Sequence, residues 1–422
     1  MQEIPYNVFN VSADQITSTD TVSFIVDMVS WINGDSKRKH YFDRRTFEWK
    51  LKHSPMERII IDRLLSFDFE EDFNYFEDKE GNKIKQIYYT FDYFGQYIFY
   101  YNPMRFYLTI MVQHQELLGK KQEDIIAEIK WLFRDYFIMP KELVDRLDRY
   151  ILLSRIDFRR DYRYRDEQEF VLIKQIIDIA PEHIMGKSYN KVDEKDEHED
   201  WDNFDDYAYM QKYKSESNET VEFVIYDKQL EQESKFRLGK TTQEILEQYK
   251  NCIRFEIRIK DKKLNNLKSD FGISKEFDNY NDESVEEEYF TKYAEQAFFN
   301  EVIYRLDYAI RLIYKSNEKS NMRRKLVKLL KDINSNGYTY TREHYKSISS
   351  FREHIKRIRA LGINPLTFKQ TWKDRFRKEH KTTYTSIPNF IQRENCLKAE
   401  DYIEDWKYVK AVEQKKKDTK AL

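Results

Sequence analysis

The stretch CIRFEIRIK, residues 252–260, alternates apolar and charged side chains without a break. A β-strand points successive side chains to opposite faces, so this pattern predicts a strand with one apolar and one charged face. The charged face carries one carboxylate among three cations, namely Arg254, Glu256, Arg258 and Lys260. A solvated edge strand is one interpretation of this face, and the wall of a functional site is the other.

Two earlier stretches predict strands of the same kind. In YILLSRIDFRRDYRY (150–164), the odd-numbered positions carry two carboxylates and three arginines: Arg155, Asp157, Arg159, Asp161 and Arg163. The even-numbered positions from Leu152 onward are mostly apolar, with Arg160 as the charged exception. In VEFVIYDK (221–228), Tyr226 and Lys228 share one face. Together the three strands suggest a single charged sheet face.

Helices and a hairpin accompany these strands. Apolar residues recur at helical spacing over 122–137, 167–180 and 286–314. Residues 84–101 predict a β-hairpin, and the polar segment 70–82 before it predicts a turn. We therefore predict an α+β fold, in which helices cover one face of an antiparallel sheet. The apolar face of 252–260 would pack against the helices 122–137 and 167–180.

Charge is distributed unevenly along the 422 residues, although the net charge is only −2. Residues 193–206 hold nine acidic residues against one lysine, whereas residues 315–381 hold nineteen Lys or Arg against six Asp or Glu. This asymmetry indicates separate regions. They are a sheet-containing domain over 1–284 with an acidic insertion loop over 185–220, a helical basic domain over 285–390, and a C-terminal helix and tail over 391–422. Two cysteines and no apolar run of membrane-spanning length favour a reduced, cytoplasmic compartment.

The basic region contains two predicted helices, over 321–333 and 341–361. A helix-turn-helix and a solvated basic bundle are equally consistent with this pattern. The candidate DNA-contacting cations here are Arg323, Arg324, Lys325, Lys356 and Arg357. Such cations would supply phosphate affinity that does not depend on DNA sequence and that falls with salt.

The residue types on the charged sheet face narrow the possible chemistry. The chain has no G-x-x-x-x-G-K-[ST], G-x-G-x-x-G or HExxH motif, so neither a glycine-rich nucleotide loop nor a histidine zinc site has support. Carboxylates suit Mg²⁺ or Mn²⁺, arginines suit phosphate, and a tyrosine can form a covalent intermediate. The combination points to phosphodiester cleavage with a tyrosine nucleophile, and a structural, salt-bridged sheet remains the alternative.

Four segments, taken in order, resemble the gene II replication initiators of filamentous phages and the related rolling-circle plasmid initiators. They are SRIDFRRDY (154–162), VIYDK (224–228), IRFEIRIKDKKL (253–264) and INSNGYTYTREHYKSISSFREHIKRIRALGIN (333–364). The chain departs from the His-hydrophobic-His metal motif of the broader rolling-circle nickases. The resemblance implies a relaxase-like nickase domain that binds its metal through carboxylates.

The resemblance also implies an activity: nicking of one strand at a duplex origin, with a tyrosine linked to the 5′ phosphate, a free 3′-OH left for synthesis, and later rejoining. It puts the nucleophile at Tyr226, with Lys228 beside it, and the metal at Asp157 and Glu256. Asp161 has no certain counterpart in the family, and its place on the same strand face makes it a possible third ligand. The sheet arginines that would contact phosphate are Arg155, Arg159, Arg254 and Arg258. The implied cofactor is Mg²⁺ or Mn²⁺. The implied partners are double-stranded origin DNA, single-stranded DNA, and the helicase and polymerase of a bacterial host cell, in whose cytoplasm the protein would act. The alternatives are a non-catalytic DNA-binding regulator and a metal-dependent nuclease that uses water.

Overall fold

The computed structural model describes two compact α+β units. The described residues are 19–33, 70–77, 83–93, 96–102, 107–117, 119–164, 167–181, 183–184, 187–193, 211–215, 220–237, 241–368 and 384–385. Among these residues, the first unit comprises those up to Phe158 together with Ile259–Glu283, and the second comprises Arg159–Arg258 and those from Ser284 onward. The α+β class is as predicted. The predicted segment 1–284 contributes to both units, and the described part of 285–390 belongs to the second.

The sheet of the first unit has the strand order β2-β3-β4-β5-β1-β6. Its strands are β1 (Thr19–Asp27), β2 (Glu70–Glu77), β3 (Lys83–Tyr93), β4 (Tyr97–Asn102), β5 (Tyr107–Gln113) and the first part of β6 (Ile151–Arg163). The predicted hairpin is confirmed, with Tyr93 opposite Tyr97 beside its turn. The turn expected over 70–82 is wrong over Glu70–Glu77, which pairs with β3 along its whole length, and residues 78–82 lie outside the described residues. A polar sequence suits this strand because it lies at the edge of the sheet.

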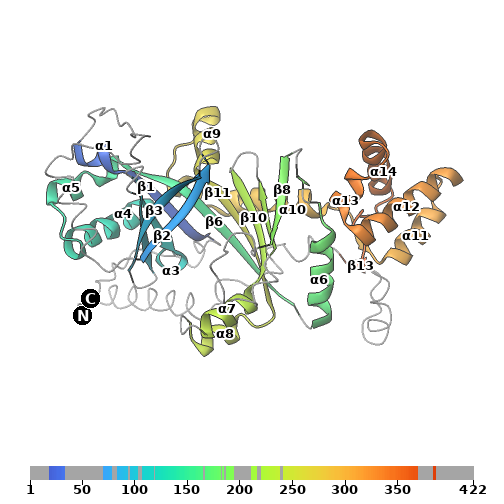
Figure 1. Ribbon diagram of the computed structural model, residues 1–422, viewed down its shortest axis with the longest axis horizontal. Helices are drawn as coiled ribbons and strands as arrows, with labels where there is room; N and C mark the ends of the chain where they lie inside the picture. Colours follow the sequence, from blue (N-terminus) through green and yellow to red (C-terminus); the bar gives the residue numbers. More distant parts are fainter. Residues whose placement is uncertain are drawn as a thin grey trace, which may run out of the picture. The chain divides into compact units, whose positions relative to one another are not determined.

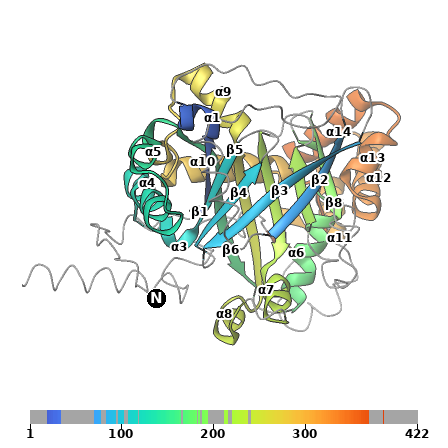
Figure 2. The same cartoon turned by 60° about the vertical axis from the view of Figure 1, so that its left-hand side comes forward.

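Aromatic packing forms the core of the first unit. The predicted helix over 122–137 is present as α4 (Gln122–Trp131) followed by a π-helical turn over Leu132–Tyr136. Phe133 in this turn stacks on Trp31 of α1 (Met28–Asn33) with ring centroids 5.4 Å apart, and its centroid lies 5.9 Å from that of Phe99 on β4. Figure 2 shows β3, β4 and β5 side by side in this unit. The remaining helical segments described in the unit are α3 (His114–Leu117), α5 (Lys141–Asp145), α9 (Asp261–Phe271) and two 3₁₀ turns, Leu147–Arg149 and Phe277–Asn279.

A register shift in β6 changes which of its side chains face the core. Leu153 is opposite Phe24 of β1, whereas Arg155 is opposite the preceding Ser23, so Ser154 is an extra residue in the strand. An extra residue of this kind reverses the alternation of faces. Leu152 is therefore 44% exposed and does not share the apolar face as predicted, while Leu153 is fully buried.

The sheet of the second unit has the order β6-β11-β10-β9-β8-β7. Its strands are the rest of β6, β7 (His183–Ile184), β8 (Lys187–Asp193), β9 (Gln211–Ser215), β10 (Val221–Asp227) and β11 (Cys252–Lys260). On the apolar face, Phe223 of β10 lies against Phe255 of β11 and against Phe298 of α10 (Glu283–Phe298). Helix α10, which the sequence had not suggested for this role, therefore covers this face (Figure 1).

Helix α10 also explains the one charged residue on the apolar face of β6. Arg160 donates to Glu286 at 2.7 Å and to Glu287 at 2.6 Å, and its guanidinium lies 4.3 Å from the ring centroid of Phe290. Arg160 and Glu286 are both almost completely buried. The charge is thus neutralised by a helix more than a hundred residues away in the chain.

The C-terminal part of the second unit is helical. The single helix expected over 286–314 is wrong: α10 ends at Phe298, Phe299 has a φ of 58°, and α11 (Leu306–Lys315) follows a short strand, β12 (Ile303–Tyr304), which pairs with β13 (Tyr384–Thr385). The next helices are α12 (Ser320–Asn336), α13 (Tyr338–Glu343) and α14 (Ile348–Ala360). The helix expected over 341–361 is therefore interrupted by a turn. Helix α6 (Glu167–Ile179) confirms the helix predicted over 167–180.

Two predicted features lie outside the described residues. These are residues 194–206 of the acidic stretch and the segment 391–422. The insertion loop predicted over 185–220 is wrong where it is described, because Lys187–Asp193 and Gln211–Ser215 pair as antiparallel strands. Within the described part of the chain, no helix has the length and apolar character needed to cross a membrane.

Candidate active site on strands β6, β10 and β11

Tyr226 stands at the end of β10, just before a capped helix. The Asp227 carboxylate accepts the Leu230 backbone N–H at 3.0 Å, as an N-cap residue does, and α7 (Lys228–Arg237) begins directly after it. Lys228 is therefore the first residue of a helix and not the last residue of the strand, as had been predicted. Burial raises the pKa of Asp227, and the backbone N–H groups of Leu230 and Gln229 oppose that shift.

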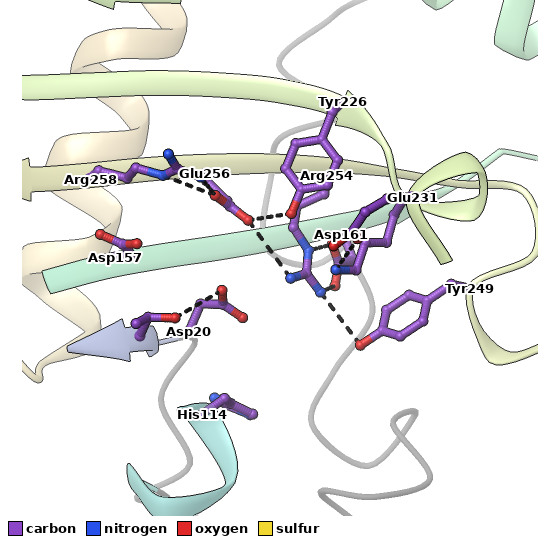
Figure 3. Close-up of polar contacts among 12 residues, drawn as sticks. Asp20, His114, Asp157, Asp161, Tyr226, Glu231, Tyr249, Arg254, Glu256 and Arg258 are labelled. Carbon is purple, nitrogen blue, oxygen red and sulfur yellow. Dashed lines mark hydrogen bonds and ion pairs between the residues drawn. The ribbon is translucent and has the colours of Figure 1, made fainter. Parts of the chain in front are cut away.

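Tyr226 and Glu256 point toward one another from the neighbouring strands β10 and β11 (Figure 3). The Tyr226 hydroxyl donates to Glu256 Oε1 at 2.5 Å. The other carboxylate oxygen, Oε2, accepts from Arg258 Nη2 at 2.8 Å and from Nε at 3.2 Å. The exposed fractions of Tyr226 and Glu256 are 7% and 3%. A phenol hydrogen-bonded to a carboxylate that an arginine orients is an arrangement able to remove the phenolic proton.

The carboxylate of Asp161 forms an ion pair with Arg254. Arg254 Nε and Nη2 donate to its two oxygens at 2.6 and 2.8 Å, and Asp161 is completely buried. The same Arg254 lies 3.8 Å from Glu256 and 3.5 Å from the Tyr249 hydroxyl. This bidentate geometry is that of a structural ion pair.

Asp157 forms a comparable pair in the first unit. Arg155, two residues away on the same strand, donates to both of its oxygens, through Nε at 2.7 Å and through Nη2. Asp157 is 2% exposed, and Arg155 is about one-third exposed. Arg155 and Asp157 lie on one face of β6, as the alternation predicted. There they bind each other.

Lys228 lies among aromatic rings and a carboxylate. Its ammonium group is 5.6 Å from the ring centroid of Tyr226 and 5.2 Å from that of Tyr249, and it forms an ion pair with Glu231. Burial raises the pKa of Glu231, but the charges of Lys228, Lys235 and Arg254 outweigh burial and lower that pKa to about 2. Neither Glu231 nor Tyr249 was predicted from the sequence. For Glu231, the signal was the spacing of Lys228, Glu231 and Lys235 at i, i+3 and i+7 on one helix.

The predicted DNA-contacting cations fall into two groups. Those on the sheet are engaged or buried: Arg155, Arg254 and Arg258 have carboxylate partners, and Arg159 is 8% exposed. In the helical region, Arg323 donates to the Tyr314 carbonyl and Arg357 to Glu318 and Glu353. Arg324, Lys325 and Lys356 are exposed. The helical region, rather than the sheet, therefore offers exposed positive charge.

The predicted metal ligands do not form a ready metal site in this arrangement. Asp157 and Asp161 each receive two hydrogen bonds from an arginine, and both oxygens of Glu256 are likewise occupied. Across the residues that the structure describes, no group of three or more His, Cys, Asp or Glu side chains could hold a metal ion. Dependence on a divalent metal stays a prediction.

No family model, curated protein or solved structure matches this chain.

Proposed function

We propose that this protein is a rolling-circle replication initiator that nicks one strand of an origin with Tyr226 as the nucleophile. Two independent features support the proposal. One is the ordered set of segments that resemble the gene II initiators. The other, which carries the argument, is the 2.5 Å hydrogen bond from the Tyr226 hydroxyl to Glu256.

The reaction follows from this hydrogen bond. Glu256 takes the phenolic proton as the Tyr226 oxygen attacks a DNA phosphorus atom, and the bond from phosphorus to the 3′ oxygen breaks. The products are a 5′-phosphotyrosyl link and a 3′-OH, whose proton comes from the protonated Glu256 or from water. Arg258 keeps Glu256 in place for both proton transfers. Reversal of the same steps rejoins the strand.

A non-catalytic DNA-binding protein is the second candidate, and burial is the observation that favours it. Tyr226 is only 7% exposed, so the nickase proposal requires side-chain movement that admits a phosphodiester. The carboxylates of Asp157 and Asp161 are bound to arginines, as they would be in a purely structural sheet.

The deciding experiment uses the full-length protein and supercoiled plasmids that carry fragments of the DNA flanking its gene. Each plasmid is incubated with Mg²⁺, with Mn²⁺ or with EDTA. The expected products are open circles and a tryptic peptide containing Tyr226 linked to DNA, identified by mass spectrometry. Intact supercoils with every plasmid and metal would leave only the non-catalytic candidate.

Three variants separate the roles of the side chains. Tyr226→Phe should lose both nicking and the adduct, whereas a nuclease that uses water would still cleave. Glu256→Gln should slow nicking by about 10²- to 10⁴-fold, the usual contribution of a general base. Tyr249→Phe is the matched control, because its hydroxyl lies 3.5 Å from Arg254 and not against the carboxylate. It should keep both nicking and the Tyr226 adduct.

A further inference from the structure

Helices α12, α13 and α14 pack into one small helical group in the second unit (Figure 1). Their buried faces carry apolar side chains, including Leu326, Leu330, Phe351, Ile355 and Ile358, and the ring of Phe351 on α14 lies edge-on to that of Tyr338 on α13. Only four residues, 344–347, separate α13 from α14, and Ser347 caps α14 by accepting the Ser350 backbone N–H. Two helices joined by a turn of three or four residues and packed on a third are the arrangement of a helix-turn-helix.

The outward face of α14 carries side chains that can read DNA bases. Ser349, Arg352, Lys356 and Ala360 are exposed and recur at helical spacing along it. Among the described residues, neither Arg352 nor Lys356 has an ion-pair partner. Arg357, on a different side of the same helix, is held by Glu318 and Glu353. Arginine and lysine bind guanine in the major groove, and serine can bind more than one base.

Helix α12 adds a row of exposed cations. Arg324, Lys325, Lys328 and Lys331 are exposed, and within the described part of the chain none of them has an ion-pair partner. Residues 320–360 hold eleven Lys or Arg against three Asp or Glu, a net charge of +8. Helix α12 packs against α14, so these cations lie on the neighbour of that helix.

We infer that α14 is a recognition helix that lies in the major groove of duplex DNA and selects a sequence through Arg352 and Lys356, while the cations of α12 bind the phosphates. The diameter of a helix, about 10–12 Å with its side chains, matches a major groove about 12 Å wide. The proton-removing site on the sheet has no part in this recognition. Helix α14 would choose where the protein binds, and it does so whether or not the protein cleaves DNA.

The test is selection by the full-length protein from a duplex library with a randomised central segment. The wild-type protein should enrich one sequence motif. Arg352→Ala combined with Lys356→Ala should weaken binding to the enriched duplex by about 5- to 150-fold for each base that is no longer hydrogen-bonded, with a much smaller effect on a scrambled duplex. Lys325→Ala combined with Lys328→Ala should weaken binding to both duplexes alike and reduce the salt dependence of log K by about two.

Controls make each outcome decisive. Lys315→Ala should enrich the wild-type motif, because Lys315 is an exposed cation at the end of α11, outside α12 and α14. Tyr226→Phe should also enrich it, so failure of cleavage and failure of recognition are distinguished. Circular dichroism and thermal melting confirm that each variant is folded. The inference is overturned if the wild-type protein enriches no motif, if the Arg352→Ala, Lys356→Ala protein enriches the same motif with the same affinity, or if Lys315→Ala loses the motif equally.

Discussion

Replacing Asp161 with alanine tests whether this residue serves an ion pair or a metal. Asp161 is completely buried and Arg254 is 3% exposed, so the substitution leaves a buried guanidinium without its carboxylate. Removing one partner of a buried pair costs about 3–5 kcal/mol of unfolding free energy. That loss is a large share of the roughly 5–15 kcal/mol that stabilises a typical protein. Urea unfolding of the full-length protein, followed by circular dichroism, measures it.

Two companion variants sharpen the same measurement. Asp161→Leu combined with Arg254→Met should recover most of the loss, because no unpaired charge is then buried. Asp135→Ala, which removes the exposed pair with Arg134, should cost no more than about 1 kcal/mol. The loss of unfolding free energy caused by Asp161→Ala should be the same in EDTA and in Mg²⁺. The ion-pair interpretation is refuted if Asp161→Ala costs less than about 1 kcal/mol in EDTA while it abolishes a Mg²⁺-dependent stabilisation of the wild-type protein.

Two other predictions concern buried titratable groups. The pKa of Glu231 is about 2 in the folded protein against an ordinary value of 4.5. Its carboxylate therefore stabilises the fold fully at pH values above 4.5. About 3 kcal/mol should be lost as the pH falls toward 2. Urea unfolding at about pH 6 and about pH 3 should show that the unfolding free energy falls less with pH for Glu231→Gln than for the wild-type protein. Equal decreases in the two proteins would contradict this prediction. Burial raises the pKa of the Cys252 thiol well above its usual range. In a Cys396→Ser protein, Cys252 should therefore react with a thiol reagent only after unfolding, and rapid reaction of the folded protein would show that the thiol is accessible.

The alternation in β10, β11 and the part of β6 after Ser154 was readable because it depends only on the geometry of a single strand. The extra residue Ser154, which exposes Leu152, was not readable in this way. The charged face of β11 was predictable residue by residue, and so was the common face of Arg155 and Asp157 on β6. Amphipathic helices were readable for the same local reason. The ends of these helices were harder to predict. Helix α10 ends after Phe298 because Phe299 adopts a φ of 58°, and the spacing of apolar residues does not indicate this backbone conformation.

The chain by itself therefore determined that carboxylates, arginines and Tyr226 gather on strand faces, since side-chain alternation follows from each strand's own backbone. The tertiary structure decided which charge meets which. Asp161 and Arg254 are 93 residues apart in the chain, and Arg160 and Glu286 are 126 apart, so only the lateral order of strands and the placement of α10 bring them together. The hydrogen bond between Tyr226 and Glu256 arises in the same way, because β10 and β11 are neighbours in the sheet. Ion pairing and proton transfer depend on distances of about 3 Å, and such distances between remote residues exist only once the chain has folded.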